Sequence, residues 1–166
     1  MRDSGSSIFT SVAVMLVNLI MPSNRQKKNT WLKKQRDIAL FEVYQRVLKS
    51  RRFSNQRDAI NFVRKSAAPR FYISAHAAVV YVNSMSAGRK LPKLNLSSRR
   101  RIEEIYRRYM NLRMQEPYAH MSTYRICQIV VEQTAPEFYI GYDLASKVIC
   151  RERNLRNSYY ARRLAL

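Results

Sequence analysis

The strongest constraint on how this 166-residue chain can fold is an internal repeat. The pattern Ala-Pro-x-Phe-Tyr-Ile occupies residues 68–73 and returns 67 residues later at 135–140. An offset of 62 aligns the Glu-x-Tyr of residues 42–44 with that of residues 104–106. Because the identities cluster within the pattern, the chain is best described as two copies of one unit. The change of offset places about five extra residues after the first helix of the second copy.

Each copy is predicted to contain three helices, because apolar residues recur at spacings of three and four on both sides of the repeated pattern. In the first copy the expected helices cover about 30–49, 55–66 and a segment that begins after Ser74. In the second copy they run from about 98 to Pro117, and over about 122–133 and 142–154. Side-chain caps are expected at Ser54 and at Ser97 or Ser98.

The composition agrees with a helical fold. Three glycines and five prolines are too few for the many tight turns of a β-sandwich or barrel. We therefore expect an all-α protein of two tandem, similar three-helix lobes. The expected boundaries are an N-terminal extension at 1–29 that is poorly ordered, a first lobe at 30–84, a linker at 85–97, a second lobe at 98–154 and a basic tail at 155–166.

The repeated pattern itself has a structural interpretation. Proline ends the second helix of each copy, and the phenylalanine and isoleucine that follow are suited to filling the core. Tyrosine would place its ring in the core and its hydroxyl at the edge. The two Phe-Tyr-Ile segments could also pair with each other as a very short two-stranded ribbon.

A short helix, a turn and another short helix resemble the helix-turn-helix DNA-binding superfamily. The resemblance covers about 34–84 and 101–153 and rests on helix spacing and on Ala59 and Ala78. The repeated pattern is also similar to that of small, basic, uncharacterised helix-turn-helix-like proteins of gut anaerobes and their mobile elements. One departure is the segment 67–74, which is longer than the usual turn of three or four residues.

Charge indicates the class of partner. The chain has 31 lysines and arginines against 11 aspartates and glutamates, a net charge of +20, which favours binding to a polyanion. Basic side chains on helix surfaces neutralise phosphates, so nucleic acid is the expected partner, with DNA favoured over RNA. The candidate nucleic-acid-binding residues are Lys27, Lys28, Lys33, Lys34, Arg36, Arg46, Lys49, Arg51, Arg52, Arg99, Arg100, Arg101, Arg107, Arg108, Tyr142, Lys147 and Arg151.

The first twenty residues have a different character, because residues 8–20 are almost entirely apolar. Three interpretations remain open. The segment could be a spurious or disordered extension before a natural start at Met21, a membrane anchor with Lys27 and Lys28 on the cytosolic side, or a helix packed on the domain. The first is favoured, and membrane binding is not expected.

No catalytic, metal-binding or cofactor-binding constellation is apparent. Cys127 and Cys150 form no CxxC pair, and neither His76 nor His120 has an acidic residue at an informative spacing. The repeat aligns Cys127 with an isoleucine, as expected for a core position. The adjacent Glu103 and Glu104 are interpreted as ion-pair partners of neighbouring arginines on one helix. We expect no enzyme, no cofactor, no metal and no small-molecule substrate.

The expected function is therefore non-enzymatic binding of duplex DNA, mainly through phosphates, in an accessory transcriptional or architectural role. An alternative is a structural or assembly protein of a nucleoprotein particle, such as a phage or ribosome, whose basic faces meet RNA, packaged DNA or an acidic protein. Either interpretation places the protein in the cytoplasm, associated with the nucleoid or within such a particle.

Overall fold

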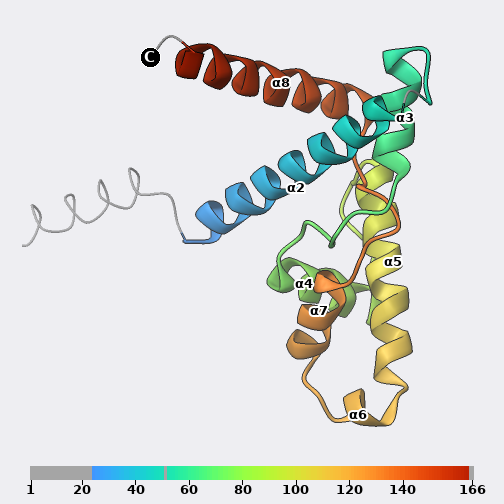
Figure 1. Cartoon of the computed structure of the whole chain (residues 1–166). Coiled ribbons are helices and arrows are strands. Elements are labelled where there is room, and N and C mark those ends of the chain that lie inside the picture. Colours follow the sequence, from blue (N-terminus) through green and yellow to red (C-terminus); the bar gives the residue numbers. More distant parts are fainter. Residues whose placement is uncertain (1–23, 51, 165–166) are drawn as a thin grey trace, which may run out of the picture.

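The computed structural model describes residues 24–50 and 52–164, and all regular elements in this part of the chain are helices. They are α2 (Asn24–Lys49), α3 (Gln56–Lys65), α4 (Ala75–Ser86), α5 (Leu96–Arg113), α6 (Glu116–Ala119), α7 (Thr123–Glu132) and α8 (Tyr142–Leu164). Figure 1 shows α2, α3 and α8 grouped at one end of the molecule and α4, α6 and α7 along the other part of α5. The predicted all-α class is confirmed.

Two of the predicted helix caps are wrong by one to three residues. The cap of α3 is Asn55 rather than Ser54, and its side-chain oxygen accepts the amide of Asp58 at 2.8 Å. The cap of α5 is Asn95, which accepts the amide of Ser98 at 2.8 Å. Asparagine and serine are nearly equivalent as caps, so the sequence offers adjacent starting points of similar stability. The predicted start after Ser74 is confirmed.

Two helices are longer than the sequence suggested. The helix α2 begins at Asn24, inside the segment expected to be an extension, and residues 1–23 lie outside the described part of the chain. The helix α8 continues to Leu164 through most of the expected basic tail. Neither helix contains glycine or proline, so the local sequence has no residue that would end it. The extra residues of the second copy form the short helix α6, which contains Pro117.

The third helix of each copy packs against the other copy. Helix α4 packs on α5 and α7, whereas α8 packs on α2 and α3. We call the group of α2, α3 and α8 lobe A, and the group of α4, α5 and α7 lobe B. The continuous lobes expected at 30–84 and 98–154 are therefore corrected, because each lobe takes its third helix from the other half of the chain.

This exchange also corrects the helix-turn-helix interpretation. In that motif the consecutive second and third helices pack against each other. Here α3 contacts α2 and α8, and the next helix, α4, belongs to lobe B. The pairs that do pack, α3 with α8 and α7 with α4, each combine helices from different copies.

The two segments of the chain that carry the repeated pattern cross at Ala68 and Ala135. The amide of Ala68 donates to the carbonyl of Ala135 at 2.9 Å, and the reciprocal bond is also 2.9 Å. Pro69 and Pro136 restrict the preceding alanines to extended backbone, which this antiparallel bridge requires. Beyond the crossing each segment leads to a helix of the opposite lobe, α4 after the first copy and α8 after the second, instead of turning back onto its own helices.

The Phe-Tyr-Ile segments hold the crossing in place but do not form the ribbon that could have paired them. The Phe71 amide donates to the carbonyl of Val131 at 3.0 Å, and the Phe138 amide to that of Arg64 at 3.2 Å. These two bonds are equivalent under the 67-residue offset, as expected for a pseudo-twofold axis. Both phenylalanines are buried, and each stacks on a tyrosine of the other copy at ring distances of 6.0 and 6.3 Å.

The packing predicts that Ala68→Leu lowers the free energy of unfolding by about 1–3 kcal/mol, because the larger side chain overpacks a buried crossing. Ala68 is 1% exposed, whereas its neighbour Ala67 is exposed. Urea denaturation measures the change, and Ala67→Leu is the matched control, expected to stay within about 0.5 kcal/mol of the parent protein. Equal effects of the two substitutions would contradict the crossing.

Candidate nucleic-acid interface

The basic residues predicted to bind nucleic acid separate into two classes, those held in ion pairs and those that point to solvent. Most of the arginines on α5 belong to the first class. Arg99 lies 3.4 Å from Glu103, and Arg107 lies 2.7 Å from Glu104. Because these groups are already neutralised by carboxylates, they are less available to phosphates than their number suggests.

Arg108 has a structural position in lobe B. Its guanidinium contacts Glu104 at 2.7 Å, donates to the carbonyl of Thr134 at 2.8 Å and lies 5.0 Å from the centre of the Phe71 ring. The hydrogen bond from Arg107, assisted by that from Arg108, lowers the pKa of Glu104, which keeps this carboxylate ionised. Arg108 therefore ties α5 to Phe71 of the first copy of the pattern and to Thr134, the residue before the second copy.

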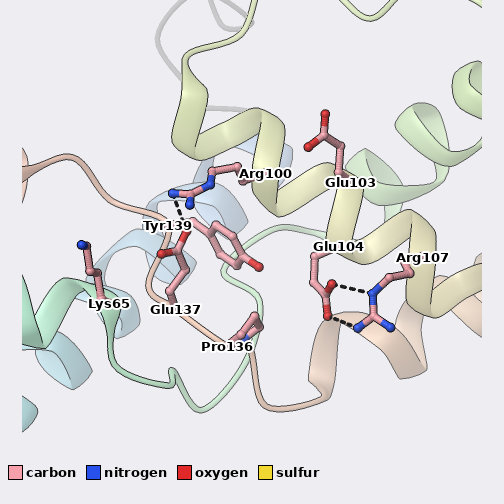
Figure 2. Close-up of a pocket in the computed structure, with 8 residues that line it drawn as sticks. All are labelled: Lys65, Arg100, Glu103, Glu104, Arg107, Pro136, Glu137 and Tyr139. Atoms are coloured by element: carbon pink, nitrogen blue, oxygen red, sulfur yellow. Dashed lines mark hydrogen bonds and ion pairs between the residues drawn. The ribbon is translucent and has the colours of Figure 1, made fainter.

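A cavity of about 410 Å³ lies between α5, the end of α3 and the second copy of the pattern. Figure 2 shows its lining, in which Arg100 reaches Glu137 and Arg107 reaches Glu104. Three cations and three carboxylates line the cavity, together with Pro136 and Tyr139. Its charges balance, so this cavity has no preference for a phosphate.

The second class of basic residues lies on lobe A. Among the predicted residues, those that are exposed and have no hydrogen-bond or ion-pair partner in the described part of the chain are Lys33, Lys34, Arg46, Lys49 and Lys147. Arg52 is also exposed, and its guanidinium rests against the rings of Phe53 and Phe62. The 3.6-residue turn of a helix places Lys34, Arg46 and Lys49 within about 120° of the circumference of α2.

A buried carboxylate fastens the two long helices of this lobe. Asp37 is 5% exposed and accepts hydrogen bonds from Arg36 at 2.7 Å and from Arg151 of α8 at 2.7 Å. Further along the same contact, Arg156 donates to Gln45 at 2.9 Å and lies 4.8 Å from the centre of the Phe41 ring. Arg151, which was predicted to bind nucleic acid, therefore joins α8 to α2, and Arg36, also predicted, is engaged by the same carboxylate within α2.

The remaining predicted residues are placed as follows. Arg101 is largely covered and points away from the exposed face of α5, and Tyr142 is half-buried with Arg57 lying 5.8 Å from its ring centre. Lys27 and Lys28 fall in the first turns of α2, and their side chains lie outside the described part, as does Arg51.

The sequence analysis missed basic residues that share lobe A. Arg153 and Arg163 of α8 and Lys65 of α3 are exposed on this lobe. A signal existed for α8, because the residues after 155 are rich in arginine, but they were interpreted as a tail. The assignment of α8 to the same lobe as α2 depends on the exchange, for which the local sequence carries no signal.

Other chemistry is sparse in the described part of the chain. Within those residues no group of histidine, cysteine and acidic side chains could hold a metal ion, and none of the described helices is long and apolar enough to cross a membrane. The apolar run at 8–20 lies outside the described residues. Cys127 is fully buried, which agrees with the predicted core position.

Comparison of the chain with protein-family models, with curated proteins and with solved structures finds no match.

The Asp37 contact predicts that Asp37→Asn lowers the free energy of unfolding by about 1–3 kcal/mol, since two arginines lose a charged acceptor at a buried position. Thermal or urea denaturation measures this loss. Glu42→Gln, an exposed carboxylate on the same helix with no ion pair among the described residues, should change stability by less than about 0.5 kcal/mol. A larger loss in the control than in Asp37→Asn would contradict the assignment.

Thiol reactivity should distinguish the two cysteines. Burial raises the pKa of the Cys127 thiol to about 11, so the group stays protonated at mildly alkaline pH, while Cys150 is only partly covered. Iodoacetamide applied at such a pH to the folded protein should label Cys150 alone, and both cysteines after denaturation, as read by peptide mass spectrometry. Rapid native labelling of Cys127 would show that the core around it is open.

Proposed function

We propose that the protein is a non-enzymatic nucleic-acid-binding protein that contacts phosphates through lobe A, with duplex DNA favoured over RNA. The observation that carries the proposal is the separation of the basic residues into two classes. On α5 four of the six arginines form ion pairs with glutamates, whereas on α2 and α8 exposed cations have no partner among the described residues. A surface of unpaired cations attracts a polyanion and gains free energy by releasing its counterions.

The dimensions of the two long helices support a duplex partner. At about 1.5 Å per residue, the 26 residues of α2 extend over about 39 Å. One turn of duplex DNA measures about 34 Å, so cations along α2 can meet successive phosphates of a rigid duplex. Helix α4 has no lysine or arginine to read base edges and lies in lobe B, so the proposed contact assigns it no role and is made with phosphates.

The proposal includes no catalytic step. The two carboxylates of α5, Glu103 and Glu104, form ion pairs with arginines, and burial raises the pKa of the Cys127 thiol, which disfavours its reactive thiolate. An accessory role in transcription or in organising DNA agrees with binding that depends mainly on charge.

A salt-titrated binding series tests the proposal. The full chain is titrated with mixed-sequence duplex DNA, duplex RNA and single strands, with an acidic polypeptide as a control ligand. Duplex DNA should bind most tightly, and the slope of log K against log salt should be several units. Replacing Lys34, Arg46 and Lys49 with glutamine should reduce the slope by about two to three units, at about 0.9 per lost phosphate contact.

The matched control removes the same number of charges from α5. Replacing Arg99, Arg100 and Arg107 with glutamine should change the slope by less than about one unit, since these residues are already paired. Similar losses in the two triple variants would show that only the total charge matters. Equal binding of all polyanions, including the acidic polypeptide, would overturn the proposal and favour a protein assembly partner.

A further inference from the structure

A second cavity, of about 350 Å³, lies on the pseudo-twofold axis between the two copies. Its walls come in equivalent pairs from the repeat, among them Tyr72 with Tyr139 and Ile73 with Ile140. It also receives the start of α5 and the first half of α2. The cavity therefore exists only because both halves of the chain meet there, and it is separate from the charge-balanced cavity in Figure 2.

The charged groups that line this second cavity are all cations. They are Lys33 and Arg36 from α2 and Arg101 from α5, and its lining includes no aspartate or glutamate. Arg36 donates hydrogen bonds to Asp37, which is not part of the lining. Lys33 has no partner among the described residues, so at least one full positive charge at the cavity is not neutralised.

Arg101 is the most informative of the three. Its Nε is buried and has no hydrogen-bond partner within the described part of the chain, and one terminal nitrogen makes a long bond of 3.4 Å to the carbonyl of Tyr72. A buried guanidinium with an unused donor is costly unless an acceptor joins it. Burial, and then the nearby charge of Arg36, lowers the pKa of Arg101.

Three helices also begin at this cavity. Ser74 precedes α4, Gly141 precedes α8, and Asn95 with Ser97 and Ser98 forms the start of α5. The N-terminal turns of helices carry partial positive charge and amides that point outward. They add to the field of the cations, and the serine hydroxyls supply further donors.

We propose that this cavity binds a phosphate monoester, with Lys33 and Arg101 as the charged partners of the phosphoryl group. A monoester carries up to two negative charges and several acceptor oxygens, which match two cations and the donors around them. The lining also includes apolar and aromatic side chains, among them Leu32, Tyr81 and Leu144, which suit a small organic group attached to the phosphate. Lys33 is also one of the unpaired cations of α2, whereas Lys34, Arg46 and Lys49, which the DNA-binding test replaces, are not part of this lining.

The test uses the full chain at physiological ionic strength. Inorganic phosphate, a nucleoside monophosphate and its unphosphorylated nucleoside are titrated by calorimetry, and the Arg101 Nε–H signal is followed by ¹⁵N NMR. We expect a single saturable site for both phosphates, a shift of that signal on binding and no binding of the nucleoside. A 5′-phosphorylated oligonucleotide compared with its 5′-hydroxyl form shows whether the phosphate can also come from the end of a nucleic acid.

Paired variants separate this site from general attraction to a basic protein. Lys33→Gln should weaken phosphate binding about tenfold or more, whereas Lys34→Gln, its exposed neighbour outside the cavity, should leave it unchanged. Arg101→Met should abolish the single site, with Arg99→Met as its control. If Arg101→Met does not fold, the lysine pair and the NMR signal of the parent protein decide the outcome.

The result that overturns the proposal is weak binding at many sites, with equal losses in Lys33→Gln and Lys34→Gln and no shift of the Arg101 signal. The variant lacking Lys34, Arg46 and Lys49 distinguishes the two proposals. It should keep the single phosphate site while its affinity for duplex DNA falls. If it loses both, the cavity is not an independent site.

Discussion

The reciprocal hydrogen bonds between Ala68 and Ala135 determine which helices share a core. Two backbone segments can cross this closely only if their side chains are small and their backbone is extended. Alanine followed by proline meets both conditions. Beyond the crossing, Phe71 packs in lobe B and Phe138 in lobe A, and the helices that follow them, α4 and α8, pack in the same lobes. Neither lobe is complete without a helix from the other half of the chain, so the two copies form one interlocked unit rather than two independent domains.

The exchange has an electrostatic result. It brings α8, rich in arginine, onto α2, so that the cations of both helices lie on lobe A. In return lobe B receives α4, which contains no lysine, arginine, aspartate or glutamate, and four of the six arginines of its helix α5 pair with glutamates. The two lobes therefore differ in charge, and this difference supports the proposal that lobe A is the one that contacts a polyanion.

Much of the fold could be predicted from the sequence, because apolar spacing and proline placement are local signals. The buried positions Leu40, Tyr44, Ile105 and Tyr109 follow from periodicity alone. The exchange could not be predicted, since an exchanged and an unexchanged molecule bury the same faces of equivalent helices. The cavity between the copies could not be predicted either, because only the crossing brings Lys33 and Arg101 together. Sequence spacing did indicate the glutamate–arginine pairs of α5. It did not indicate how many of the basic residues these pairs make less available to phosphates.

The exchanged helices also set an order in which the molecule can be assembled. The partners within lobe B, α4, α5 and α7, follow one another closely along the chain, so this lobe can close as soon as α7 has been synthesised. Lobe A joins the first described helix to the last, and α2 and α3 must wait with their apolar faces uncovered until α8 emerges. Contacts between such distant segments slow folding. Lobe A of the nascent chain thus lacks one of its helices until the end of synthesis. A truncation that removes α8 would therefore destabilise α2 and α3, at the beginning of the described chain, as well as its end.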